Sequence, residues 1–392
     1  MSKVSDLKKI LLFPLLFSIS QIQANDFGSA IKNTSVSGLV RAGYINVNPD
    51  IAGNKTTSAT AIAAQLKLET GIWHGLQIGV APYVVQKISD LSGDKSDNEL
   101  NGDFFDRTND SYAYLGEAYL NYSRGAGSLR IGRQLLDNPF INTDDIRSHP
   151  NTFDAVWLNY RFSDALNIEA GKVKRWAGFD SGASQEKFKK ASNDGVVAIG
   201  ASYQLNQNQA YQAWYYDFDN SHQQVYFDLS YTRGDLEAGF QYSNFNESNN
   251  SSVDGAVYGV SIAYTIDKLS LNAAFNEVSN GGGQSVSNGL GGGNFFTSMD
   301  ELTIDGINDA SSYLIGADYS VSDNLSISLA FGHFKDGKKI TSDIDETDLV
   351  VNYAINDKTD VEYIYADVSN DAAPADVDTN FKRQVLRVNY QF

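Results

Sequence analysis

The side chains best suited to chemistry in this sequence are arginines that fall on the polar faces of short alternating segments. They are Arg41, Arg130, Arg161, Arg383 and Arg387. A guanidinium group stays charged at physiological pH, and its planar fork of donors matches the geometry of a carboxylate. Such a set indicates reversible electrostatic binding of dissolved ions rather than the making and breaking of bonds.

Histidine and cysteine give no catalytic or metal-binding pattern. The four histidines are scattered over turns, loops and segment ends, and cysteine is absent, which excludes thiolate metal sites and disulfides. We therefore predict no catalytic residues and no resident metal. Asp336 follows three residues after His333, so a hydrolase that uses an Asp–His pair is an alternative function for this protein.

The elements that position these arginines are segments of about nine to eleven residues with period-two polarity. In 155–162, for example, Val156 and Leu158 lie on one face while Trp157 and Asn159 lie on the other. We count eighteen such strands, approximately 36–44, 61–71, 76–85, 112–123, 127–135, 152–162, 167–173, 195–204, 208–216, 223–232, 236–244, 255–265, 269–277, 311–320, 325–333, 347–355, 359–368 and 382–392.

The connections between these strands alternate in length. Those after even-numbered strands are short, and most of those after odd-numbered strands are long, including 86–111, 136–151 and 278–310. Bacterial outer-membrane barrels have this asymmetry, with short periplasmic turns and long external loops. We predict an all-β fold, namely a transmembrane antiparallel β-barrel of about eighteen strands that is wide enough for an aqueous lumen.

A soluble β-sandwich is the structural alternative, because it also alternates. Two features favour the membrane barrel. The chain stops on Phe392 at the end of its last strand, which resembles the terminal aromatic assembly signal of outer-membrane proteins. Aromatic residues also gather at segment ends, as an interfacial girdle would; these are Tyr44, Tyr83, Tyr112, Tyr114, Tyr122, Trp157, Phe162, Tyr203, Tyr231, Tyr353 and Tyr390.

The N-terminus has the features of an export signal. Three lysines precede the apolar run 10–19, and Ala24 ends a plausible cleavage site, so we expect a signal peptide over 1–24 and a single barrel domain over 25–392. The whole chain carries a formal net charge of −18, which argues against a nucleic-acid partner.

The stretch 115–174 carries a more specific resemblance. It contains Gly116-Glu117-Ala118, Gly132-Arg133-Gln134, Asp145-Ile146-Arg147 and Thr152-Phe153 followed by Val156. Their order and spacing resemble the OprD-type outer-membrane porin family, and 38–44 and 383–392 resemble the family's first and last strands. The resemblance implies a channel for small hydrophilic solutes, often amino acids, peptides or carboxylates, with a third loop folded into the lumen.

The resemblance also suggests which residues form the constriction. The third loop corresponds to 136–151, so Asp144, Asp145 and Arg147 become constriction candidates, and the five arginines named first become the basic pore lining. Arg133 has the opposite parity but could be turned inward by a bulge. His149, in the same loop, is a further candidate.

The expected partners are outer-membrane lipid, lipopolysaccharide, the barrel-assembly machinery through Phe392, and small solutes. The sequence does not decide between a monomer and a homotrimer. We expect no cofactor, although Ca²⁺ on the acidic loops 94–110, 343–348 and 367–378 is an alternative to plain solvation. The strong acidity favours weak cation selectivity. A surface adhesin or receptor that uses the barrel only as a scaffold is a second rival.

Overall fold

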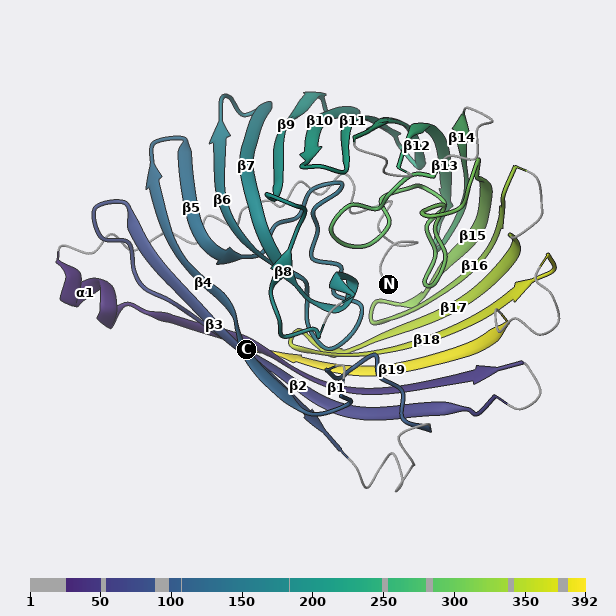
Figure 1. Ribbon diagram of the computed structural model, residues 1–392, viewed down its shortest axis with the longest axis horizontal. Helices are drawn as coiled ribbons and strands as arrows, with labels where there is room; N and C mark the ends of the chain where they lie inside the picture. The colour runs from purple at the N-terminus through teal and green to yellow at the C-terminus, as the bar shows by residue number, and fades with distance from the viewer. Residues whose placement is uncertain are drawn as a thin grey trace.

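The computed structural model describes residues 26–50, 54–88, 99–106, 108–182, 184–248, 253–279, 285–337, 342–372 and 380–392. Its strands form one antiparallel sheet that closes on itself, because β1 pairs with β19 as well as with β2 (Figure 1). The predicted signal peptide lies outside the described residues. In the part of the chain that is described, no helix is long and apolar enough to cross a membrane.

Eighteen of the strands make the barrel, as predicted, and the short β8 is an addition inside a loop. The strands are Ser35–Pro49 (β1), Thr57–Glu69 (β2), Leu76–Lys87 (β3), Tyr112–Arg124 (β4), Gly127–Gln134 (β5), Thr152–Arg161 (β6), Leu166–Ala177 (β7), Lys189–Lys190 (β8), Val196–Asn206 (β9), Gln209–Phe218 (β10), His222–Arg233 (β11), Leu236–Glu247 (β12), Gly255–Ile266 (β13), Leu269–Ser279 (β14), Ser311–Ser322 (β15), Leu325–Lys335 (β16), Asp343–Asn356 (β17), Thr359–Asn370 (β18) and Phe381–Gln391 (β19).

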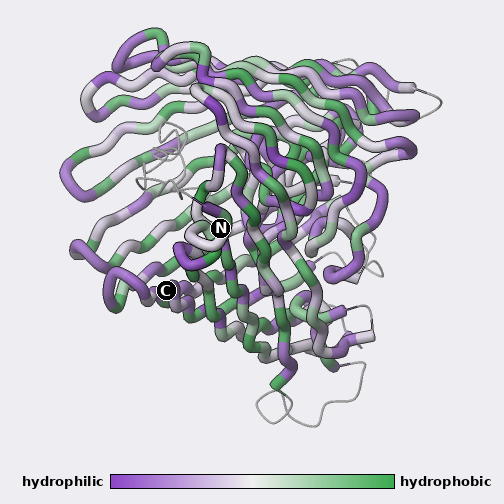
Figure 2. Tube along the Cα trace, turned by 90° about the vertical axis from the view of Figure 1, so that its left-hand side faces the viewer, coloured by the Kyte–Doolittle hydropathy of each residue, from purple (hydrophilic) through white to green (hydrophobic). Residues whose placement is uncertain are grey.

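The period-two polarity sorts side chains between the two faces of the barrel wall. On β13, Val260 and Ile262 are about half exposed on the outer face, whereas Ser261 and Ala263 between them are buried inside. Figure 2 shows the same alternation along neighbouring strands. Lipid accepts the outer apolar row, and lumen water accepts the inner polar row, so the sequence pattern fixes the direction of each face.

The predicted aromatic girdle is only partly correct. Tyr44, Phe162 and Tyr390 are exposed on the outer face at strand ends. Tyr83 and Trp157, by contrast, are no more than 5% exposed and point inward. Their strand parity places them on the lumen face, where Tyr83 packs against His149 of the third loop and Trp157 stacks on Trp214 of β10 instead of contacting lipid.

The described parts of four long connections, at the end of the barrel opposite the short turns, fold back into its interior (Figure 1). We name them L2 (88–111), L3 (135–151), L4 (178–195) and L7 (280–310); L4 contains β8 and the 3₁₀ helix Phe179–Ser181 (η3). Phe104 and Phe105 of L2, Phe140 of L3 and Phe295 of L7 are all buried inside. The sequence predicted only L3 to enter the lumen.

A short helix lies at the other end. Helix α1 (Phe27–Lys32) begins after Asp26, whose carboxylate accepts a hydrogen bond from the Ser29 backbone N–H at 2.8 Å. The ring of Phe27 packs edge-on against Trp73 of the first short turn. This contact ties the segment before β1 to the short-turn end of the barrel.

Candidate functional site

Loop L3 is held against the lumen wall by an aromatic box around His149. The imidazole is fully buried between Tyr83, Tyr112 and Tyr114, and its Nε2 lies 2.7 Å from the Tyr112 hydroxyl oxygen. Its Nδ1 lies 3.0 Å from the carbonyl oxygen of Pro150. Burial lowers the pKa of His149 to about 4, so the ring is neutral at physiological pH. His149 thus anchors L3 rather than facing the solute path.

L3 is also bound to L7, the long and glycine-rich connection between β14 and β15. The Asn142 backbone N–H donates to the Leu290 carbonyl at 3.0 Å, and its side-chain amide exchanges hydrogen bonds with the backbone of Gly292. A Cβ atom on Gly292 would lie 2.2 Å from the Asp144 carboxyl group. Gly289, Gly291 and Gly292 therefore allow L7 to approach L3 closely, while Gly281–Gly283 lie outside the described residues.

The centre of the site is an ion pair between the barrel wall and L3. Arg41 on β1 donates from its two terminal nitrogens to the two Asp145 carboxylate oxygens, at 2.7 and 2.9 Å. Its Nε donates to the Asn389 side chain on β19, and it also donates to the Arg147 carbonyl. The pKa of Asp145 is lowered; its burial acts in the opposite direction, but Arg41 outweighs it.

The two arginines of β19 are paired in the same way. Arg387 forms a two-nitrogen ion pair with Glu362 on β18 and donates to the Asp145 backbone carbonyl at 3.1 Å. Arg383 forms an ion pair with Glu301 of L7 and lies 3.8 Å from an Asp300 carboxylate oxygen. Strand β19 thereby contacts both L3 and L7, and Glu362 of β18 pairs with one of its two arginines.

Arg147 completes this group from the L3 side. Its Nε lies 3.3 Å from an Asp103 carboxylate oxygen of L2, and its guanidinium stacks over the Phe179 ring of η3 at 4.4 Å. A further nitrogen lies 3.9 Å from Glu301. One side chain thus connects four of the structures that narrow the lumen.

The tip of L7 is fixed by carboxyl groups of β17. Glu346 accepts hydrogen bonds from the backbone N–H groups of Glu301 and Leu302, both at 2.8 Å, and Asp348 accepts one from Asp300 at 3.1 Å. Glu346 and Asp348 are two residues apart and almost fully buried on the inner face. The sequence had placed 343–348 among acidic loops, but these residues extend strand β17 instead.

We call this set of contacting groups the eyelet. It contains four arginines and seven carboxyl groups, so acidic groups outnumber basic ones. Among the described residues, no cluster of histidine and carboxylate side chains has a geometry suited to a metal ion. The members are Arg41, Arg147, Arg383, Arg387, Asp103, Asp145, Asp300, Glu301, Glu346, Asp348 and Glu362.

The remaining predicted residues lie elsewhere. Arg130 lies on the wall at β5, with its guanidinium 4.4 Å from the centre of the Tyr119 ring. Arg133 stacks over Phe188 of L4 and donates to a β4 carbonyl. Arg161 is exposed at the short-turn end of β6, and Asp144 packs against L7. The structure therefore brings Arg41, Asp145, Arg147, Arg383 and Arg387 together.

Sequence reasoning missed Asp103, Asp300 and Glu301, and it counted Glu346 and Asp348 with the acidic loop 343–348 although the predicted strand 347–355 already contained Asp348. A signal existed for the last two, because their spacing continues the inward parity of β17. No comparable signal existed for the other three. Their position depends on how L2 and L7 fold, and period-two patterning does not describe loops.

The fold and this site define a wide antiparallel β-barrel channel with its lumen narrowed by loops. The family model described as "outer membrane porin, OprD family" matches residues 30–312. The chain belongs to the OprD family of outer-membrane porins. It is located in the outer membrane of a Gram-negative cell. It forms a channel for small solutes.

Solved structures agree in fold. The structure of OpdK from Pseudomonas aeruginosa with vanillate has a TM-score of 0.77 at 17% identity, covering 92% of this chain and 99% of that one. OccAB4 from Acinetobacter baumannii has a TM-score of 0.76 at 18% identity, covering 92% and 98%. No curated protein sequence matches this chain.

Proposed function

We propose that this porin favours small cations and zwitterions, such as amino acids and short peptides, over simple anions. The observation that carries the proposal is the charge balance of the eyelet. Each of its four arginines is already paired with a carboxylate, as in Arg41–Asp145 and Arg387–Glu362, and Asp300 adds a carboxylate beyond these four pairs. Fixed charges of excess sign in a narrow, low-dielectric passage attract ions of the opposite sign.

A zwitterion fits this arrangement better than a simple ion of either sign. Its carboxylate can exchange with Asp145 or Glu362 on an arginine, because Arg41 already holds both oxygens of a carboxylate and Arg387 already holds one carboxylate oxygen with two of its nitrogens. Its ammonium group is attracted by the surplus acids. Opposed charges would also orient the molecule along one axis as it passes.

Small carboxylates are the second candidate class. The arginines favour them, and the related OpdK structure contains vanillate, a carboxylate. The two classes can be separated in planar bilayers by the reversal potential in a KCl gradient, and in proteoliposomes by comparing the uptake of glycine with that of lactate. We expect a cation-selective potential and faster glycine uptake. An anion-selective potential together with faster lactate uptake would refute the proposal.

The same proposal covers export and assembly. A signal peptide at 1–24 would be cleaved before insertion, and Phe392 would be read by the barrel-assembly machinery; its backbone pairs with Gly38 of β1 at the closing seam. Lipopolysaccharide would contact the outer face. We also propose that solute passage requires no cofactor. Three secondary proposals are homotrimer formation, Ca²⁺ binding by external carboxylates and a role as a surface receptor.

The structure offers little support for a hydrolase. His333 lies 2.8 Å from an Asp345 oxygen and 3.4 Å from an Asp343 oxygen, rather than being paired with Asp336. Asp336 instead accepts a hydrogen bond from the Ser342 backbone N–H. Hydrolysis of liposome lipid by the purified protein, lost in His333→Ala, would be needed to revive that alternative.

A further inference from the structure

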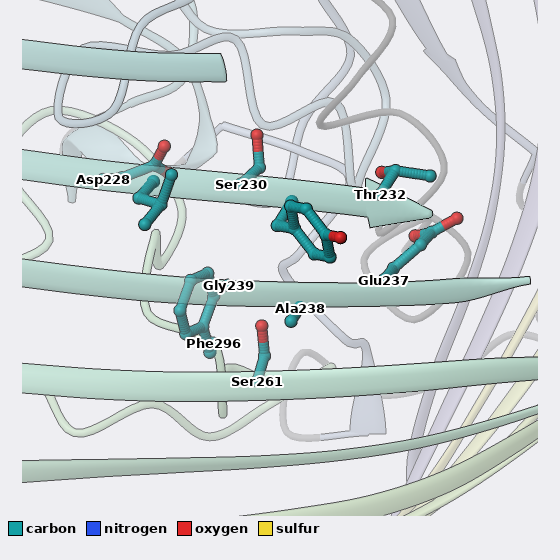
Figure 3. A pocket seen from close by; sticks show the side chains of 10 residues that line it. Asp228, Ser230, Thr232, Glu237, Ala238, Gly239, Ser261 and Phe296 are labelled. Carbon is teal, nitrogen blue, oxygen red and sulfur yellow. The ribbon is translucent and has the colours of Figure 1, made fainter. Parts of the chain in front are cut away.

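A small pocket lies in the lumen wall on β11, β12 and β13, apart from the eyelet (Figure 3). Its floor is Gly239, which stands opposite Ser230 of β11 and Ser261 of β13 in the strand register. Thr232 and Glu237 line the side nearest the short turn, and Asp228 lines the other. The ring of Phe296, from L7, lies above the glycine.

Glycine is needed at the floor because the ring sits so close. A Cβ atom on residue 239 would lie 2.8 Å from Cζ of Phe296 and 2.5 Å from Oγ of Ser261. The ring itself is held in place by its backbone, since the Phe296 N–H donates to the Gln241 side chain at 2.8 Å. The space is therefore bounded by fixed groups on the wall and on L7.

Size limits what this pocket can hold. Its volume is about 20 Å³, and a cavity needs only about 10–15 Å³ on the same measure to hold one water-sized group. An ammonium group or a hydroxyl group fits. A sugar ring or a second carboxylate does not.

The charge and the hydrogen-bond acceptors of the pocket lining favour an ammonium group over a hydroxyl group. The lining contains the carboxyl groups of Asp228 and Glu237 and no basic residue. Among the described residues, the buried hydroxyl oxygens of Ser261 and Thr232 have no hydrogen-bond partner, and Ser261 is only 7% exposed. An ammonium group has three N–H donors for such acceptors, and an aromatic face attracts its charge.

We infer that this pocket is a binding site for the compact primary ammonium group of a solute, on the short-turn side of L7. Thr232 lies one residue before the turn at 233–235, so the pocket is near the periplasmic mouth of the barrel. A cationic or zwitterionic solute that has passed the eyelet would bind here before leaving. The inference rests on the proposed function only in that cations must enter the lumen.

The test is the reduction of single-channel K⁺ current by methylammonium, titrated from the short-turn side of the full-length mature porin in a planar bilayer. The double variant Glu237→Gln/Ser261→Ala should raise the apparent Kd of methylammonium about tenfold, as expected for the loss of a charge-assisted hydrogen bond. Gly239→Ala, which fills the floor, should raise it in the same way. The double variant keeps the test valid if the glycine variant does not fold.

Two controls make the result specific. Asp318→Asn removes a carboxylate from the lumen wall at β15, outside the pocket, and should leave the Kd unchanged. Tetramethylammonium is too large for the cavity and has no N–H donor, so the pocket variants should not alter its effect. An unchanged methylammonium Kd in the double variant, or an equal change for both ions, would overturn the site.

The outcome is separable from that of the proposed function. Pocket-dependent methylammonium binding in a channel with an anion-selective reversal potential would refute the proposed selectivity and retain the site. A cation-selective channel in which the pocket variants leave methylammonium binding unchanged would refute the site and retain the proposed selectivity.

Discussion

The Arg41–Asp145 pair predicts that Asp145→Asn will loosen L3 and change the ion selectivity of the channel. The variant keeps the shape of the side chain but removes the charge that receives two Arg41 nitrogens at 2.7 and 2.9 Å. The Arg41 side chain is 8% exposed and that of Asp145 is 34% exposed, so solvent screens one partner and not the other. The variant therefore leaves a buried guanidinium without its main counter-charge.

The size of the effect follows from this partial exposure. Exposed ion pairs contribute up to about 1 kcal/mol, and breaking a fully buried pair costs about 3–5 kcal/mol. A value of about 2 kcal/mol is appropriate for this pair, which corresponds to roughly a thirtyfold weaker docking of L3. The uncompensated charge also acts on permeating ions. One charge at about 4 Å is worth about 1 kcal/mol in water, so we expect the ratio of cation to anion permeability to fall two- to fivefold at low salt.

Single-channel recording measures both quantities. Asp145→Asn should show more frequent transitions to a larger conductance, and its reversal potential in a KCl gradient should move toward that of an anion channel. Asp144→Asn is the matched control, because it removes the same charge from the same loop at a residue that packs against Gly292. If both variants shift the potential equally and neither changes the conductance, the ion pair does not hold the loop.

Three further predictions follow from the same site. Deleting residues 142–148 should raise single-channel conductance and reduce discrimination between solutes, because it removes most of the L3 contacts with Arg41 and L7; equal conductance would contradict the role of L3. Arg383→Gln combined with Arg387→Gln should shift the reversal potential further toward cations, and an unchanged potential would mean that ions do not sense these residues. Because burial lowers the pKa of His149 to about 4 from the ordinary 6.5, its contribution to stability should be lost as the pH falls from 6.5 to 4, and His149→Phe should flatten that part of the denaturation profile.

The barrel itself could be predicted from the sequence. All eighteen predicted strands form, because alternation with period two encodes both the strand and the direction of each face. The predicted and observed strand bounds differ mostly at the strand ends next to the long loops. Strand β17, for example, begins at Asp343 rather than at 347, since charged inward positions there looked like a solvated loop.

The site was only half predictable. Parity alone placed Arg41, Arg383 and Arg387 inside, and the family resemblance supplied L3 with Asp145 and Arg147. Parity could not show that Asp300 and Glu301 reach Arg383, because nothing in a glycine-rich segment specifies the direction in which it folds. Parity also could not distinguish Arg161 from the eyelet arginines. Arg161 shares their inward parity but lies exposed at the far end of its strand.

The sequence by itself determined the closed sheet, its lipid-facing exterior and its charged interior, because each of these follows from local alternation of polarity. Only the tertiary structure decided that L2, L3, L4 and L7 meet inside and pair Arg41, Arg147 and Arg383 with loop acids. The physical reason is that such pairs join residues far apart in the chain, as Arg41 and Asp145 are, and their formation depends on loop packing rather than on any local pattern.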